Sequence, residues 1–181
     1  MRFLKLNDCL RFASDAGVTE AELAAAAQES AEIPAIRVDI EDNRHRAFFL
    51  ATQLVGLFQE FEYGLMWVTD FGIWPSSENQ HLYYRLRRAL GDSEKLNTHP
   101  GHLFAANEQD DFITFVHLAI EFGWGANILI KPPYKWVHTS HDGWLRIISA
   151  PGDKNLAEVV KAWSVPFQIE KAKANKRTRL Q

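Results

Sequence analysis

The residues best suited to chemistry lie between Asp70 and Glu78, where an apolar run gives way to a helical pattern. Crevices at such strand-to-helix junctions often bind ligands in α/β proteins. Free backbone N–H groups at the start of the helix would hold an anion, and the Ser77 hydroxyl would add a donor. Asp70 would supply a carboxylate and Trp74 a flat apolar wall. The segment therefore predicts a site for a small anionic ligand or for another protein.

A basic and aromatic stripe continues along the helix that follows. At helical spacing His81, Tyr84, Arg85 and Arg88 share one polar face, opposite the leucines of the same helix. Arginine and aromatic side chains often anchor interfaces, so this stripe would grip phosphate or the carboxylates of a partner. The alternative is structural: capped helix ends, solvated arginines and a packed Trp74.

Proton transfer is the basis of a second functional hypothesis. Asp70, Glu78 or His102 would handle protons for an anion held near Ser77, as in a hydrolase acting on a phosphorylated or nucleic-acid substrate. The contiguous run 140–142 contains Ser, His and Asp, but contiguous residues do not form a catalytic triad. We therefore favour a protein-interaction or small-ligand-binding domain over an enzyme, with the hydrolase as the alternative.

Two pairs of histidines stand three residues apart. On a strand, His138 and His141 would point to opposite faces, whereas a Pro-Gly turn would bring His99 and His102 within about 7 Å of each other. Zinc needs at least three protein ligands, so a site at His99 and His102 would require His81 or Asp111 to come close, which the sequence does not show. The chain also lacks the glycine-rich nucleotide loops, the serine elbow and the HExxH helix. We predict no metal and no cofactor, and the role of His99 stays open.

Composition is that of a folded domain. The 181 residues are 46% hydrophobic and 24% charged, which excludes a disordered chain or a disulfide scaffold. The single cysteine, Cys9, lies beside Asp8, which raises the pKa of a thiol and argues against a nucleophile. The chain start lacks a secretory pattern, and the longest apolar run, 47–58, is about half of the ~20 residues that cross a bilayer. These features predict a cytoplasmic protein with no membrane partner.

Charge is distributed unevenly. The segment 168–181 holds five basic residues and one acidic residue, so it carries +4, and the remaining chain carries −7 of the net −3. A basic tail attracts polyanions, so nucleic acid is a possible partner only there. The alternative is a solvated chain end.

Helical and strand patterns alternate along the chain. Helices are predicted within 7–28 (two), 42–58, 78–90, 107–120 and 156–163, and strands at 36–40, 64–69, 128–130, 134–140 and 144–149. They predict an α+β (mixed α/β) fold with one mixed or largely antiparallel sheet and helices packed on it. The expected domains are a helical appendage at 1–33, a mixed α/β domain at 34–165 and a flexible basic tail at 166–181.

Local signals add detail. Asn7 is expected to cap the first helix, and Thr19 with Glu22 forms a capping box for the second. The leucines within 82–90 are expected to face the core. The helix within 42–58 is expected to be buried on nearly every side. Trp124 is expected to lie in a surface loop, as Trp74 is. The Asp142-Gly143 turn predicts a hairpin with Thr139 opposite Arg146.

The run from Trp67 to Tyr83, with Pro100 to Phe104, resembles stretches of uncharacterised bacterial proteins. The resemblance implies no activity, cofactor or site residue.

Overall fold

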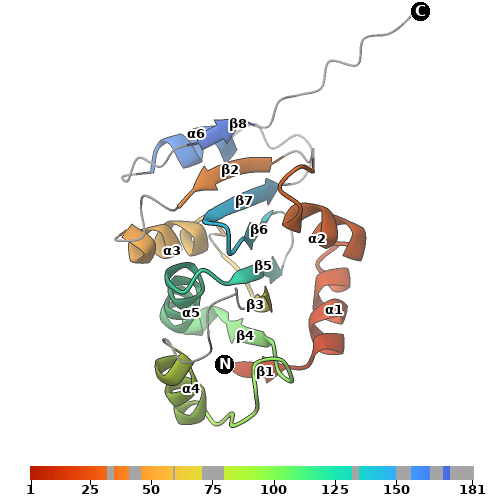
Figure 1. The fold of residues 1–181 in the computed structure, drawn as a ribbon, viewed down its shortest axis with the longest axis vertical. Helices are drawn as coiled ribbons and strands as arrows, with labels where there is room; N and C mark the ends of the chain where they lie inside the picture. The colour runs from red at the N-terminus through yellow and green to blue at the C-terminus, as the bar shows by residue number, and fades with distance from the viewer. Residues whose placement is uncertain are drawn as a thin grey trace, which may run out of the picture.

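The computed structural model describes residues 1–31, 35–40, 46–58, 60–70, 80–131, 135–149, 156–163 and 169–171. Within them, one eight-stranded sheet has the order β1-β4-β3-β5-β6-β7-β2-β8, and every neighbouring pair is antiparallel (Figure 1). The strands are Arg2–Leu4 (β1), Ala35–Asp39 (β2), Tyr63–Asp70 (β3), Gly101–Ala105 (β4), Gly125–Lys131 (β5), Lys135–Thr139 (β6), Trp144–Ser149 (β7) and Ile169–Lys171 (β8). The predicted α+β fold with a largely antiparallel sheet is confirmed.

Helices cover both faces of the sheet. In Figure 1, α1 (Leu6–Asp15) and α2 (Glu20–Ala27) lie on one side, and α3 (Ala47–Gly56), α4 (Gln80–Ala89) and α5 (Gln109–Glu121) lie on the other. The short helix α6 (Leu156–Lys161) lies near the β8 edge, and a 3-10 turn, η2 (Ala106–Glu108), precedes α5. No helix among the described residues is both long and apolar enough to span a bilayer.

Successive side chains of the central strands point to opposite faces of the sheet, so a hydrophobic core forms on each face. In β3, Leu65 and Trp67 pack under α1 and α2, whereas Met66 and Val68 pack with α3 and α5. Successive side chains of a strand point to opposite faces, so a strand covered on both sides is apolar throughout. The sheet is therefore the middle of three layers.

The N-terminal segment contributes directly to this arrangement. Strand β1 pairs with β4 at the sheet edge, and α1 and α2 supply Cys9, Phe12 and Leu23 to the core beneath them. The Thr19 capping box is confirmed, but Lys5 rather than Asn7 is the N-cap residue of α1. The division into domains at 1–33, 34–165 and 166–181 stays a prediction.

Strands β1, β4 and β8 were not predicted, because β1 and β8 have only three residues each and β4 begins at Gly101 directly after Pro100, residue types that favour a turn. The predicted Pro-Gly turn between His99 and His102 is wrong, since Gly101 is the first residue of β4. A Cβ at Gly101 would collide with Cys9 Sγ and approach Leu4 Cβ to 2.9 Å. Glycine is therefore present there because α1 and β1 approach the backbone closely.

The β6–β7 hairpin exists, with a register one residue away from the predicted one. Thr139 pairs with Leu145 and His138 with Arg146, because Ser140 N–H donates to the Trp144 carbonyl at 2.8 Å and closes a three-residue loop. Gly143 takes φ +78°, the left-handed position of such a loop. The shift brings His138 and Arg146 onto one face.

Burial differs from the prediction at two further places. Phe48 and Phe49 of α3 are 54% and 56% exposed, so that helix is not buried on every side, because only its inner face meets α5 and the sheet. Trp124 is 3% exposed and packs against Tyr83 with ring centroids 4.9 Å apart. It is a core residue and not a surface anchor.

Candidate functional site

Helix α4 is oriented differently from the prediction. Tyr83 and Arg87 are both fully buried, while Leu82 is 59% exposed and Leu90 is 38% exposed. Tyr83 and Arg87 lie four residues apart and so share the inner face. The leucine pattern therefore did not mark the core side of this helix.

A chain of hydrogen bonds fixes the inner face of α4 to the sheet. His102 on β4 contacts the Met66 carbonyl through Nδ1 at 3.1 Å, so Nδ1 carries the proton and donates. Its Nε2 then accepts from the Tyr83 hydroxyl, and the Tyr83 oxygen accepts from Arg87 at 2.9 Å. Within the described residues, both ring nitrogens of His102, the Tyr83 hydroxyl and the two terminal nitrogens of Arg87 thereby have partners, whereas the buried Arg87 Nε has none.

The network continues from Arg87 into the loop after α4. Arg87 donates to Asp92 and to the His99 carbonyl, and Asp92 lies 3.3 Å from His99 Nδ1. Gly91, at φ +88°, ends the helix and turns the chain back, so that Asp92 N–H donates to the Arg87 carbonyl at 3.0 Å. The helix end therefore positions Asp92 beside the guanidinium.

Aromatic rings enclose these polar groups. Phe3 on β1 lies 4.5 Å from the Arg87 guanidinium, and the Phe115 ring lies 5.0 Å from that of His102. Burial, with the nearby Arg87 charge, lowers the pKa of His102 to about 3. Burial alone would raise the pKa of Asp92, but the hydrogen bonds from Arg87 and a backbone N–H lower it. Burial also raises the pKa of Tyr83.

This network has the properties of a structural anchor. His102 is fully buried and uses both ring nitrogens within the protein, so it has no free nitrogen for a substrate proton. His99 is 20% exposed and lies nearest to the surface. The prediction that His102 handles protons in a site is therefore not favoured.

The outward side of α4 carries the predicted stripe in modified form. His81, Arg85 and Arg88 are exposed, but Tyr84 is partly buried and its hydroxyl accepts from Leu96 N–H at 3.3 Å. We define the α4 outer face by its exposed residues, His81, Leu82, Arg85, Arg88 and Ala89. Neither arginine forms an ion pair within the part of the chain that the structure describes.

The other predicted residues do not converge on this network. Asp70 lies four residues beyond Met66 on β3, about 13 Å along the strand from the pairing position of His102. Its carboxylate contacts His141 Nδ1 at 2.9 Å, and His141 Nε2 contacts Asp142 at 3.2 Å, all at the surface. Trp74, Ser77 and Glu78 lie outside the described residues.

A second buried polar cluster lies under α2, on the opposite face of the sheet. Arg146 donates to the Gln28 and Glu29 carbonyls at 2.6 Å each, which satisfies the end of α2. His138 contacts the Asn127 amide oxygen at 2.9 Å, and burial together with the Arg146 charge lowers its pKa to about 4. The cluster holds α2 to the sheet.

Metal and thiol chemistry have no geometric support in the described residues. No group of three or more His, Cys, Asp or Glu side chains is placed there to hold an ion. Burial, followed by the charge of Asp8, raises the pKa of Cys9 to about 12, as the neighbouring acid predicted in direction. The thiol is fully buried.

Comparison with known proteins gives no functional lead. No protein-family model, no curated protein and no solved structure matches the chain.

One signal for the α4 anchor was available in the sequence. Tyr83 and Arg87 stand at positions i and i+4, and Gly91-Asp92 follows directly. An aromatic and a cation on one helix face, with an acid just past a glycine helix end, suits an inward ion pair. The competing leucine pattern obscured this interpretation.

Proposed function

We propose that the protein is a cytoplasmic interaction module whose α4 outer face binds an acidic, amphipathic segment of another protein. The observation that carries the proposal is the exposed Leu82, 59% accessible, beside the exposed Arg85 and Arg88. An apolar side chain next to unpaired arginines is a common composition of binding surfaces.

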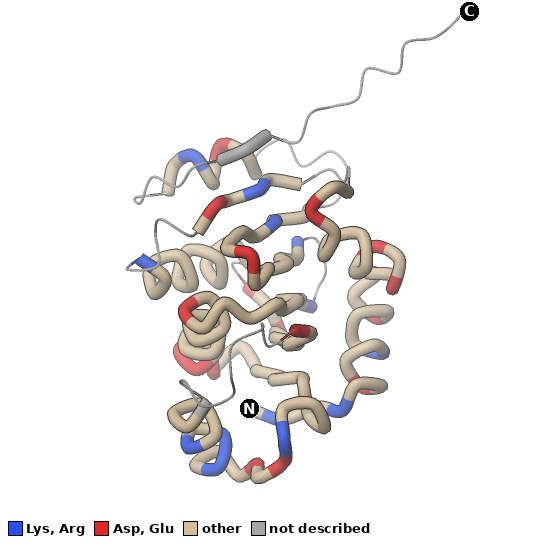
Figure 2. The backbone as a smooth tube through the Cα atoms, in the orientation of Figure 1, with Lys and Arg blue, Asp and Glu red and all other residues tan. Residues whose placement is uncertain are grey.

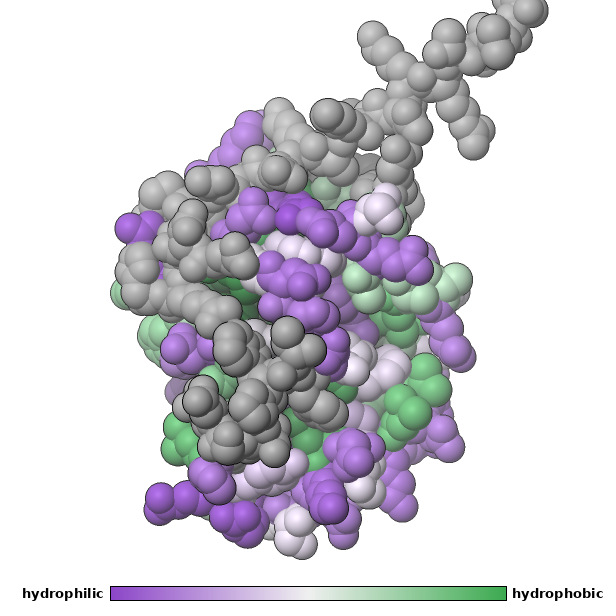
Figure 3. Space-filling model, viewed as in Figure 1, coloured by the Kyte–Doolittle hydropathy of each residue, from purple (hydrophilic) through white to green (hydrophobic). Residues whose placement is uncertain are grey.

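Charge supports an acidic partner. In Figure 2 the basic residues of α4 form a blue group with no acidic residue on the helix. In Figure 3 strongly hydrophilic and hydrophobic residues lie side by side at the lower left, where Figure 1 places α4. Carboxylates of a partner would pair with the arginines, and an apolar side chain of the same partner would cover Leu82.

The anchor beneath α4 makes this surface rigid. Tyr83 is bonded to His102 and Arg87 to the His99 carbonyl, so the helix is held from inside, and we expect its outer face to be ordered before a partner binds. A pre-ordered surface loses less conformational entropy on association than a flexible one. The buried network and the exposed stripe thus serve the same function.

The hydrolase alternative has weaker support. Of its proposed proton-handling residues, His102 is buried and committed to Tyr83, and Asp70 is engaged with His141. Glu78 lies outside the described residues. No specific observation favours hydrolysis over binding.

Charge reversal on α4 tests the proposal. We expect the Arg85→Glu/Arg88→Glu protein to lose the co-purifying proteins that the unchanged protein captures, with little change in thermal stability, because both side chains are exposed. Capture by the unchanged protein should weaken as salt rises. Captured proteins are identified by mass spectrometry and mapped to their acidic segments with synthetic peptides.

A matched control changes the same amount of charge on the opposite side of the sheet. Lys5→Glu/Arg11→Glu alters two exposed residues at α1 and should keep the captured set. Leu82→Ser should weaken capture without changing charge. Retention of the same partners by the α4 double variant, or equal loss in the α1 control, would refute the assignment of the surface.

A further inference from the structure

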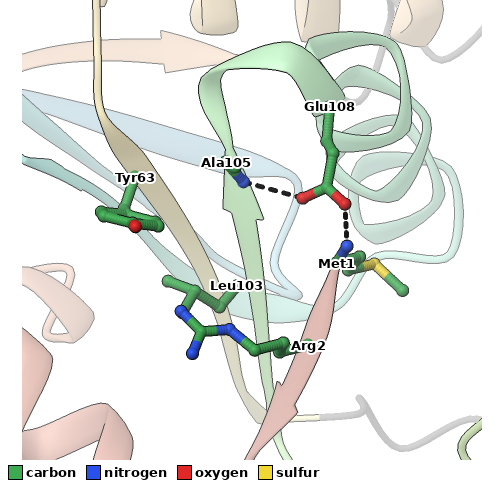
Figure 4. Close-up of a pocket in the computed structure, with 6 residues that line it drawn as sticks. All are labelled: Met1, Arg2, Tyr63, Leu103, Ala105 and Glu108. Carbon is green, nitrogen blue, oxygen red and sulfur yellow. Dashed lines mark hydrogen bonds and ion pairs between the residues drawn. The ribbon is translucent and has the colours of Figure 1, made fainter.

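A pocket lies at the corner of the sheet formed by β1, β3 and β4, and no residue of α4 lines it (Figure 4). Its volume is about 320 Å³, at the lower end of the range for small-molecule sites. The lining residues are Met1, Arg2, Tyr63, Leu103, Ala105 and Glu108. They come from strands paired in register and from the turn before α5.

The carboxylate in this pocket is fully engaged. Glu108 accepts from the Met1 ammonium group through Oε1, and from Ala105 N–H through Oε2 at 2.8 Å. Hydrogen bonds from these two donors lower the pKa of Glu108, so it stays ionised. Its negative charge is thereby offset within the wall of the pocket.

Arg2 is the cation that remains available. Its side chain extends from β1 past Leu103 towards Tyr63, and the guanidinium lies 6.0 Å from the Tyr63 ring centroid (Figure 4). Within the described residues it has no hydrogen bond or ion pair of its own, and neither has the Tyr63 hydroxyl. Two cationic groups and one carboxylate leave the pocket with a net positive charge.

A second cation beside the pocket is already neutralised. Lys131 on β5 pairs with Tyr63 on the side of β3 opposite to β4, and the Lys131 Nζ lies 2.9 Å from the Asp15 carboxylate. The Lys131 ammonium also lies 4.6 Å from the Phe12 ring. The charge of Arg2 also helps to lower the pKa of Glu108, but within the described residues its guanidinium has no hydrogen bond or ion pair, so its donors remain available to a ligand entering this corner.

We infer that this pocket binds a small organic anion, a carboxylate or a phosphate monoester attached to a flat apolar group. The anionic group would accept hydrogen bonds from Arg2 and the Tyr63 hydroxyl, and arginine presents a planar pair of donors that suits either anion. The flat group would lie against the exposed edges of Leu103 and Ala105, which are the smaller, apolar part of a mainly polar lining. This inference does not depend on the partner proposed for α4.

Nuclear magnetic resonance titration of the full chain tests this site. Benzoate and phenyl phosphate serve as the anionic probes, with benzyl alcohol as the neutral one, and any purification tag is placed at the C-terminus. We expect saturable shifts of the Leu103 and Ala105 amide signals with a dissociation constant on the order of 1 mM, as suits probes of this size. The tighter of the two anions identifies the preferred anionic group.

Variants assign the binding to Arg2. Arg2→Gln should weaken the anions about tenfold, because a charge-assisted hydrogen bond is lost, while Arg2→Lys should retain part of the affinity. Tyr63→Phe removes only the hydroxyl and should weaken binding less. Arg11→Gln, at an exposed arginine of α1 outside the pocket, should bind as the unchanged chain does.

Three results would overturn the inference. They are the absence of saturable shifts at Leu103 and Ala105 with either anion, equal binding of benzyl alcohol, and undiminished affinity in Arg2→Gln. Each variant is first shown to be folded by its amide spectrum. Arg2 is exposed, so its replacement leaves the fold intact.

Discussion

Mild acid should destabilise this protein through two buried histidines. The pKa of His102 is about 3 and that of His138 about 4 in the folded chain, against an ordinary value near 6.5. Between these values the unfolded chain binds more protons than the folded one. Stability is therefore complete above the unfolded pKa and falls as the pH falls below it.

The magnitude follows from these pKa values. For a group that is protonated in the unfolded chain but not in the folded one, each pH unit changes the free energy of unfolding by about 1.4 kcal/mol. Lowering the pH from ~7.5 to ~5 should therefore cost about 2 kcal/mol for each histidine, or about 4 kcal/mol for both. This is a large part of the roughly 5–15 kcal/mol that stabilises a typical domain. Carboxylates with lowered pKa values lose their contribution only at lower pH.

Urea unfolding followed by tryptophan fluorescence measures the effect. The free energy of unfolding is determined at several pH values in that interval for the unchanged chain and for His102→Gln and His138→Gln. Each substitution removes one titrating ring, so each should abolish about half of the pH dependence whatever it does to absolute stability. His81→Gln is the matched control, because it removes a histidine of the exposed α4 outer face that lies in neither buried cluster, and it should keep the full slope.

A flat stability profile over this interval would refute the reasoning. So would a His102→Gln protein with the full slope, because the ring would then not be held neutral by burial and Arg87. A change in the urea dependence of unfolding alone would instead indicate a change in the exposed surface.

Two further substitutions test the packing and the anchor. Gly64→Ala should destabilise the fold by about 2 kcal/mol, because the new Cβ would come within 2.5 Å of the Phe112 ring, whereas Gly56→Ala, with open space, should be neutral or stabilise by about 0.5 kcal/mol. Thermal unfolding measures both, and equal effects would contradict the close approach at Gly64. Asp92→Asn should lower the free energy of unfolding by about 3 kcal/mol, because it leaves the buried Arg87 without its carboxylate. A loss of stability no larger than that caused by replacing an exposed arginine would show that the pair is not buried.

Periodicity predicted the elements whose apolar pattern is long and consistent. The apolar strand at 64–69 and the hairpin strands appear within a few residues of the expected bounds, as do the two helices before Gln28. The Thr19 capping box was readable because its hydrogen bonds are local. Edge strands β1 and β8 are three residues long, too short for a pattern of their own.

The orientation of α4 illustrates what periodicity leaves undetermined. Its leucines predicted one face as the core, and the helix instead buries Tyr83 and Arg87. A buried arginine is stable only where acceptors pair with its guanidinium. For Arg87 these acceptors are Asp92 and the His99 carbonyl, which come from the loop beyond the helix. A helix sequence does not contain the partners that decide which face turns inward.

The sequence by itself determined the fold class, the central strands, the Thr19 capping box and the uneven charge, because each depends on composition or on neighbours within a few residues. Only the tertiary structure decided that His102 is an anchor, that Asp70 pairs with His141, and that Arg2 faces a pocket. Those outcomes depend on strand order and on a hairpin register, where one residue of shift moves a side chain to the other face. Contacts between residues 36 or more positions apart in the chain, such as His102 with Met66, arise only when the sheet is assembled.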